Sequence, residues 1–181
     1  LTFCSSFGQT FLISVFAGVI REEFGLSHGD WGLIYSVGTF ASAVVMVWAG
    51  VLTDHFRVRV LGAVVLVMLA AACIATAVVP GAWALPFVIF ALRFAGQGMT
   101  THIAAVAMAR WFVVSRGKAL SVASVGFAVG EAILPLAVVS LMDEVPWRGI
   151  WIGFAVFAVA MVPVLARLLR LERTPQAVAA E

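Results

Sequence analysis

The chain has 181 residues, of which 64% are apolar and only 11% are charged. Soluble domains contain about 45–50% apolar and about 25% charged residues, so a soluble protein of this length could not bury so much apolar surface in one core. A lipid bilayer is therefore the expected solvent for most of these side chains. The formal net charge of +2 is too small to indicate a nucleic-acid partner.

Apolar stretches long enough to cross a hydrocarbon core of about 30 Å recur six times along the chain. Because backbone N–H and C=O groups cannot stay unpaired in lipid, each stretch is predicted to be a transmembrane helix. The predicted spans are residues 1–20, 31–53, 60–79, 83–109, 118–141 and 148–169. The predicted fold class is thus an all-α membrane protein with six transmembrane helices. Leu1 already lies in an apolar run, so the first helix is expected to be truncated.

Basic residues gather on one side of this predicted topology. Eight of the eleven follow the second, fourth and sixth spans: Arg57, Arg59, Arg110, Arg116, Lys118, Arg167, Arg170 and Arg173. Acidic residues lean towards the opposite side. The positive-inside rule then places both ends of the chain in the cytoplasm. The protein is expected to be an integral protein of the cytoplasmic (inner) membrane.

The short loop after the second span carries the sharpest local pattern. It reads Gly50-Val-Leu-Thr-Asp54-His55-Phe-Arg57-Val-Arg59. This resembles the signature loop of the major facilitator superfamily, which reads Gly, three residues, Asp, a basic residue, any residue, Gly, any residue, then a basic residue. Gly50, Asp54 and Arg59 match, whereas His55 and Arg57 depart. The resemblance implies a conformational gating loop formed by Gly50, Asp54, Arg57 and Arg59; the alternative is an ordinary cytoplasmic turn.

Three other segments resemble the same superfamily, in the right order along the chain. They are Arg93-Phe-Ala-Gly96-Gln97-Gly98 in the fourth span, the loop from Arg110-Trp111-Phe112 to Arg116-Gly117-Lys118-Ala119, and Trp147-Arg148 at the start of the sixth span. The resemblance implies the amino-terminal half of a twelve-helix fold, built as a three-plus-three inverted repeat, with a carboxy-terminal six-helix half as its partner. Residues 1–170 would form the bundle, and residues 171–181 would begin a central cytoplasmic loop.

Small residues at equivalent places in the two three-helix units support the internal repeat. Gly38-x-x-x-Ser42 lies in the second span and Gly126-x-x-x-Gly130 in the fifth, and such spacing lets helices approach closely. Drug–proton antiporters of the superfamily carry Gly-Pro-x-x-Gly-Gly in the fifth span. Here Glu131 stands at the Pro position, which disfavours that subclass without removing it.

Two ionisable residues are predicted inside spans, where such side chains cost at least about 2.5–3.5 kcal/mol and are usually functional. Arg93 lies roughly 15 Å into the fourth span and Glu131 roughly 20 Å into the fifth, so both are expected near the midplane, where transporter sites lie. Three interpretations stay open. Arg93 binds an anionic substrate group while Glu131 carries a coupling proton; the two form a structural ion pair; or Arg93 serves helix-dipole and backbone contacts.

Gln97, Gln9 and Tyr35 complete the predicted substrate-binding or proton-coupling set. They belong to polar stripes on the fourth, first and second spans, at spacings that share a helix face. The alternative is that such polar side chains pack helix interfaces. His102 is interpreted as an interface histidine, although a histidine could also titrate during transport. No second His or Cys stands at ligand spacing, so neither a metal site nor a cofactor is predicted.

The predicted function is secondary active transport of a small solute by alternating access, with proton coupling as a hypothesis. An organic anion such as a carboxylate is favoured, because a guanidinium group binds carboxylates and phosphates in a bidentate fashion. Catalysis is not expected, since His-Glu-x-x-His and Gly-x-Ser-x-Gly patterns are absent from the sequence. The alternatives are a drug or metabolite efflux antiporter and a non-transporting six-helix membrane subunit.

Overall fold

The computed structural model describes residues 1–112 and 114–170, and within them it contains helices and turns but no strand. Six segments are long and apolar enough to cross a membrane: Thr2–Phe24, His28–His55, Val58–Ala77, Ala82–Trp111, Arg116–Met142 and Trp147–Leu168. The prediction of an all-α protein with six spans is confirmed. Residues 171–181, predicted to begin a central loop, lie outside the described part.

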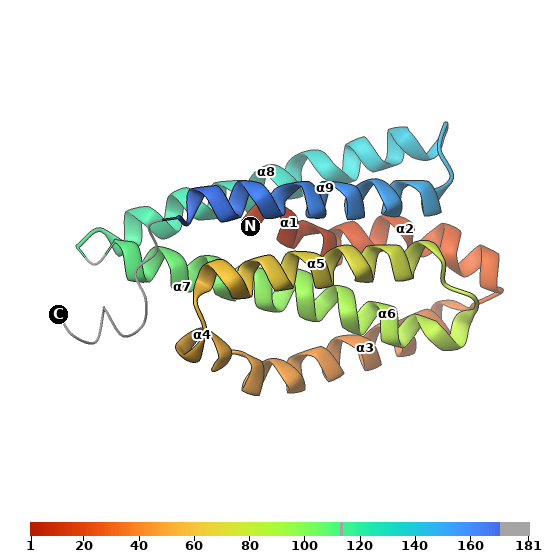
Figure 1. Ribbon diagram of the computed structural model, residues 1–181. Helices are drawn as coiled ribbons and strands as arrows, with labels where there is room; N and C mark the ends of the chain where they lie inside the picture. Colours follow the sequence, from red (N-terminus) through yellow and green to blue (C-terminus); the bar gives the residue numbers. More distant parts are fainter. Residues whose placement is uncertain (113, 171–181) are drawn as a thin grey trace.

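The spans run back and forth along one bundle (Figure 1). In chain order the helices are α1 (Thr2–Ser5), η1 (Ser6–Gly8), α2 (Thr10–Phe24), α3 (His28–Ala49), α4 (Leu52–His55), α5 (Val58–Ala77), η2 (Ala82–Ala84), α6 (Leu85–Leu92), η3 (Arg93–Thr100), α7 (Thr101–Trp111), α8 (Arg116–Met142) and α9 (Trp147–Leu168). The first span therefore consists of α1, η1 and α2, and the fourth of η2, α6, η3 and α7.

The turn between the first two spans is shorter than predicted. The polar stretch 21–30 was expected to separate them, but only residues 25–27 are not helical. Gly25, at φ 62°, ends α2 in the left-handed conformation that glycine adopts readily. Ser27 and Asp30 then form a capping box that begins α3. These caps set the helix ends, so the flanking polar residues are drawn into helices.

The first span is not the continuous helix that its apolar length predicts. Gln9 is extended, with φ −86° and ψ 152°, and it separates η1 from α2. In an unbroken α-helix the N–H of Leu12 would donate to the carbonyl of Gly8; here Leu12 and Ile13 both donate to the carbonyl of Gln9, at 3.2 and 3.1 Å. Such a break at membrane depth is tolerated only where protein or a cavity surrounds it.

At the break, the backbone of the first span packs directly against the backbone of the fourth span. A Cβ at Gly96 would lie 2.7 Å from both Cα and N of Gly8, and a Cβ at Gly8 would overlap the carbonyl oxygen of Leu92. Glycine at both positions is what allows this approach. The fourth span is itself irregular here, because η3 is a π-helix, a form that is frequent at functional sites. Both irregular segments thus meet at one crossing, halfway along the fourth span.

The contacts between helices follow an internal two-fold relation between the first three spans and the last three. α3, from the first three-span unit, packs on α6 of the second, and α8 of the second unit packs on α1 of the first. Gly38 allows the first contact, since a Cβ there would lie 2.8 Å from the carbonyl oxygen of Pro86. Gly126 allows the second, where a Cβ would lie 3.2 Å from the nitrogen of Phe3. α5 and α9 pair with each other, which completes the three-plus-three inverted repeat.

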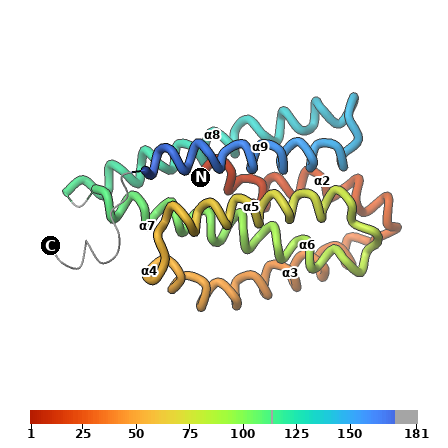
Figure 2. Tube along the Cα trace, in the orientation of Figure 1, coloured from red at the N-terminus to blue at the C-terminus, as the bar shows by residue number. Residues whose placement is uncertain are grey.

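Burial differs sharply among the spans. In the most apolar stretch of each span, 56% of residues are buried for α5, but only 17% for the span of α3 and 11% for α8. Figure 2 shows α3 and α8 along opposite edges of the bundle. These two helices leave most of their side chains available to lipid or to another protein surface.

Candidate functional site

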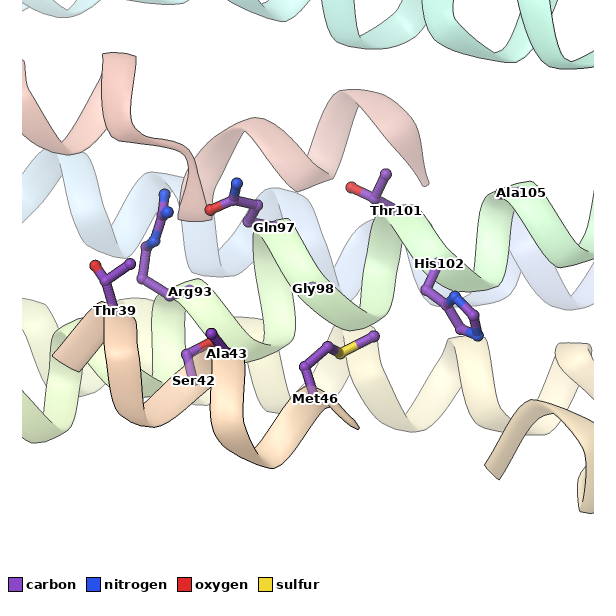
Figure 3. A pocket seen from close by; sticks show the side chains of 10 residues that line it. All are labelled: Thr39, Ser42, Ala43, Met46, Arg93, Gln97, Gly98, Thr101, His102 and Ala105. Carbon is purple, nitrogen blue, oxygen red and sulfur yellow. The ribbon is translucent and has the colours of Figure 1, made fainter. Parts of the chain in front are cut away.

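A cavity of about 530 Å³ lies between α3 and the middle of the fourth span. Its polar lining residues are Thr39, Ser42, Arg93, Gln97, Thr101 and His102. Figure 3 shows Thr39 and Ser42 on α3, and it shows Arg93, Gln97 and Thr101 on the fourth span with their side chains directed towards the first span. The permanent charge on this wall is the guanidinium of Arg93.

Arg93 is held against the break in the first span. Its Nη1 donates to the carbonyl oxygen of Gly8 at 3.3 Å and to Thr10 Oγ1 at 2.9 Å. The carbonyl that the break releases is therefore satisfied by a side chain from 85 residues further along the chain. The guanidinium also lies 5.7 Å from the ring centroid of Tyr35, a favourable cation–π distance, and Tyr35 Oη donates to Thr10 Oγ1 at 2.9 Å.

A second cavity of about 480 Å³ lies on the other side of the fourth span, against α1 and α8. Gln9, Ser124 and Phe127 line it, and Gln97 and Thr101 line both cavities. The fourth span therefore lies between the two cavities and supplies lining residues to both. Of the predicted set, Arg93 lines the first cavity, Gln9 the second and Gln97 both. Tyr35 lines neither, but its ring lies beside the guanidinium of Arg93.

Glu131 lies apart from that cluster. It follows Phe127 of the second cavity by one helical turn on α8, and its side chain is exposed in this six-helix bundle. Its neighbour Gly130 packs against Ser6 of the first span. The ion pairs found within residues 1–112 and 114–170 are Arg110 with Asp54 and Arg148 with Glu23, so the structural Arg93–Glu131 pair is not formed there.

Ser5 and Ser6 are two further polar residues of the first span, close to Gln9. Both are buried. Ser5 Oγ donates to the carbonyl of Thr2 at 2.6 Å, as serine hydroxyls often do inside helices. Ser5 and Gln9 line the second cavity, whereas Ser6 lines neither of the two cavities.

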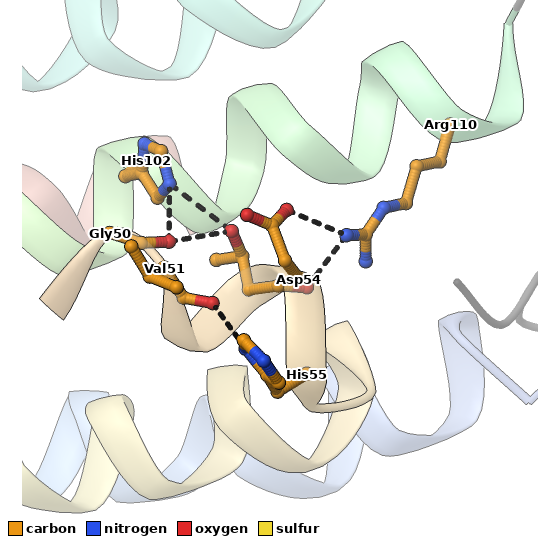
Figure 4. A network of polar contacts seen from close by, with 7 residues as sticks. Gly50, Val51, Asp54, His55, His102 and Arg110 are labelled. Atoms are coloured by element: carbon orange, nitrogen blue, oxygen red, sulfur yellow. Dashed lines mark hydrogen bonds and ion pairs between the residues drawn. The ribbon is translucent and has the colours of Figure 1, made fainter. Parts of the chain in front are cut away.

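The loop after the second span contacts the end of the fourth span (Figure 4). Arg110 Nη2 donates to the carbonyl oxygen of Thr53 at 2.6 Å and lies 3.6 Å from Asp54 Oδ1. The Asp54 side chain is 72% exposed, so this ion pair is open to solvent. Gly50 and Asp54 thus face α7, whereas Arg57 and Arg59 line a separate groove against the end of α9.

His102 connects this loop to the first cavity, whose wall it shares. Its Nε2 lies 3.2 Å from the carbonyl oxygen of Gly50 and 3.3 Å from Thr53 Oγ1, while Thr53 Oγ1 donates to the same carbonyl at 2.8 Å. A carbonyl oxygen only accepts, so Nε2 must carry the hydrogen that is shared between these two acceptors. This geometry supports the interpretation of His102 as an interface residue.

The sequence model of the Major Facilitator Superfamily matches residues 1–181, the whole chain. The chain belongs to the major facilitator superfamily. Membership in this superfamily of transporters supports movement of a small solute across a lipid bilayer, and it supports a transporter over an enzyme. Among the residues that the structure describes, no group of three or more His, Cys, Asp or Glu side chains could hold a metal ion.

One curated relative is the protein of Cupriavidus necator named "Probable sulfoacetate transporter SauU". It is 29% identical to this major facilitator chain over 140 residues, which is 75% of the chain and 32% of the relative. The chain therefore spans about a third of the length of the relative that it matches.

Sequence reasoning missed Thr10 and Thr53, which are central to the two polar clusters. Thr10 accepts hydrogen bonds from Arg93 and Tyr35, and Thr53 offers its carbonyl to Arg110. A threonine next to a glutamine, or inside a signature loop, carries no signal of its own. The contacts depend on partners 83 and 57 residues away, which a local pattern does not reveal.

Proposed function

We propose that this chain forms the amino-terminal half of a secondary active transporter, which carries a small organic anion through the cytoplasmic membrane by alternating access. A carboxy-terminal six-helix half completes the fold, and both ends of this chain lie in the cytoplasm. The exposed α3 and α8 support that arrangement, since they supply apolar surface for a second bundle. The short match to a longer relative supports it as well.

The observation that carries the proposal is the buried, unneutralised guanidinium of Arg93 on a cavity wall. Its side chain is only 8% exposed, and within the described residues no carboxylate forms an ion pair with it. A permanent charge within a membrane span is energetically costly, so a residue that carries one usually has a function. The name of the C. necator relative adds independent support, because sulfoacetate carries both a carboxylate and a sulfonate.

In this proposal Glu131 carries the coupling proton, while Gln97, Gln9 and Tyr35 contact the substrate. Glu131 has no hydrogen-bond or ion-pair partner in the described part of the chain, although it lies within a membrane span. An isolated charge within a membrane span is costly, so a carboxyl group there usually has a function, such as carrying a proton or pairing with a cation. Alternation between these two conditions is what proton coupling requires.

Gly50, Asp54, Arg57 and Arg59 act in this proposal as the gating loop. The open ion pair between Asp54 and Arg110 supports a contact that forms and breaks during the cycle, because an exposed pair contributes little free energy. A loop that was locked by strong contacts would hold one state permanently.

The test is uptake of radiolabelled sulfoacetate and of succinate by the full-length protein in proteoliposomes, with and without an inward proton gradient. We expect saturable uptake that the gradient accelerates. Glu131→Gln, which cannot titrate, should lose the acceleration but keep exchange of labelled for unlabelled substrate, which needs no net proton movement. Glu131→Asp, the matched control, should keep both.

Three results would contradict the proposal. Acceleration that persists in Glu131→Gln removes the proton role. Uptake of neither anion, together with gradient-driven export of cationic dyes, favours the efflux antiporter of the same superfamily. The absence of any flux favours a non-transporting membrane subunit.

A further inference from the structure

The break in the first span leaves backbone donors without partners. The first N–H groups of a helix have no acceptor within it, and no side chain caps the start of α2. Leu12 and Ile13 donate to the carbonyl of Gln9, so the N–H groups of Thr10 and Phe11 find no acceptor in the described part of the chain. This helix end lies next to the Gly8–Gly96 crossing, with Gln9 and Phe11 half-buried and Thr10 exposed.

The Thr10 hydroxyl is a third free donor at the same place. Its oxygen accepts one hydrogen bond from Arg93 Nη1 and one from Tyr35 Oη, both at 2.9 Å. Because a hydroxyl oxygen has two lone pairs, both are occupied and its own hydrogen remains available to donate. The side chain of Thr10 is exposed, so that hydrogen is accessible to a ligand.

Arg93 adds a charge and a further donor that has no partner. Its Nε is buried and makes no hydrogen bond, and neither does Thr39 Oγ1 on the same cavity wall. Figure 3 shows Thr39 beside Arg93, with the guanidinium directed towards the first span. Buried polar groups without a partner are rare in folded proteins, since each costs about 1–3 kcal/mol. Two of them on one cavity wall indicate that a polar ligand completes the site.

We propose that the amino end of α2 and the guanidinium of Arg93 form a single oxyanion site, which binds the carboxylate or sulfonate head of the transported molecule. The inference rests on the proposed function and states where the anion binds. The helix end supplies partial positive charge and the N–H groups of Thr10 and Phe11. Arg93 supplies a full charge, and the hydroxyl of Thr10 fixes the orientation. The same charges disfavour a cationic substrate.

One experiment removes a backbone donor without breaking the helix. Thr10 is the first residue of α2, a position where proline is favoured, and Gln9 already has the extended conformation that precedes proline. Thr10→Pro removes both the hydroxyl and the N–H, whereas Thr10→Ala removes only the hydroxyl. In the full-length protein in proteoliposomes, we expect the half-saturating concentration of sulfoacetate to rise about tenfold further in Thr10→Pro than in Thr10→Ala.

A second pair of variants keeps the test decisive if Thr10→Pro fails to fold. Thr10→Asp places a tethered carboxylate in the proposed site, where the helix end and Arg93 stabilise it; Thr10→Asn is its neutral match in shape. We expect Thr10→Asp to melt at a higher temperature than Thr10→Asn, and yet to take up sulfoacetate and succinate at least about tenfold more slowly.

The outcomes separate this inference from the proposed function. If the unmodified protein takes up neither anion, the proposed function fails and the inference fails with it. If the unmodified protein transports an anion but Thr10→Pro matches Thr10→Ala, or Thr10→Asp matches Thr10→Asn, the function stands and the oxyanion site at α2 is wrong.

Discussion

The two ends of the bundle are joined by polar contacts of different strength. At one end, here the Arg148 end, Arg148 of α9 donates to Glu23 Oε1 at 2.6 Å and to the carbonyl oxygen of Ala77 at 2.7 Å. Trp147 Nε1 donates to the other Glu23 oxygen at 2.8 Å. At the opposite end, the Arg110 end, a 2.6 Å hydrogen bond from Arg110 to the carbonyl of Thr53 accompanies the open 3.6 Å ion pair. His102 adds two longer contacts to the same loop, at 3.2 and 3.3 Å.

The helices that each end joins explain the difference. The Arg148 contacts tie together α2, the end of α5 and the start of α9, whereas the Arg110 contacts tie the loop after α3 to α7. α3 and α7 border the cavities, while α5 and α9 pair with each other. The Arg148 contacts thus hold helices that pair away from the two cavities, and the Arg110 contacts lie beside the helices that border them. Stability and the transport cycle should therefore respond to different ends.

The largest effect is expected from Arg148→Ala. It removes the hydrogen bonds to the carbonyls of Ala77 and Val79 and one of the two donors to Glu23, which keeps Trp147. We expect the free energy of unfolding to fall by about 3 kcal/mol from the loss of these hydrogen bonds. Thermal melting of the purified full-length protein in detergent measures this loss. Arg148→Lys should recover part of it. If the folded Arg148→Ala protein also shows an altered half-saturating substrate concentration, the assignment of stability and transport to different ends of the bundle is wrong.

Arg110→Ala should have an intermediate effect. The side chain is only 14% exposed and makes the short bond to the Thr53 carbonyl, so its loss should cost about 2 kcal/mol. We also expect faster exchange of an engineered cysteine in the loop with a thiol reagent, because the loop loses its anchor to α7. If Arg110→Ala lowered the melting temperature but left the reactivity of the engineered cysteine unchanged, the contacts of Arg110 would have a structural role only.

The smallest effect is expected from Asp54→Asn, which keeps the shape and removes the charge. Since the Asp54 side chain is 72% exposed and its contact is 3.6 Å long, we expect a change of about 0.5 kcal/mol in stability. Turnover should change more than melting if this pair gates the cycle. If Asp54→Asn and Arg110→Ala lowered stability equally, the ion pair would account for the whole contribution of Arg110. That result would contradict the contribution expected from the hydrogen bond to the carbonyl of Thr53.

The six spans and the inverted repeat followed from the sequence because hydrophobic length and small-residue spacing are local properties. The break at Gln9 did not, since no proline marks it. Its cause is the contact of Gly8 with Gly96 and the bond from Arg93, which come from a segment about 85 residues away. An apolar stretch gives the length of a span but not its continuity.

For the candidate site, residue counting predicts a depth for each side chain but not its direction. Counting residues at a fixed rise brought Arg93 and Glu131 to similar depths, and yet the first points to the break and the second is exposed. The rotation of a helix about its own axis is set by the packing of its neighbours, here of Gly130 against Ser6. Polar stripes in a membrane helix are equally ambiguous, because serine and threonine also pack interfaces.

The crossing of Gly8 and Gly96 has a consequence for how this sequence can vary. In most pairs of packed residues, a larger side chain at one position can be compensated by a smaller side chain at the other. Here both partners already have the smallest side chain, and a Cβ on either would lie within 2.8 Å of backbone atoms of the other. No exchange of size can rescue a substitution at either position. The spacing between Arg93 and the end of α2 is consequently set by main chain alone, and it should persist while the side chains around it change.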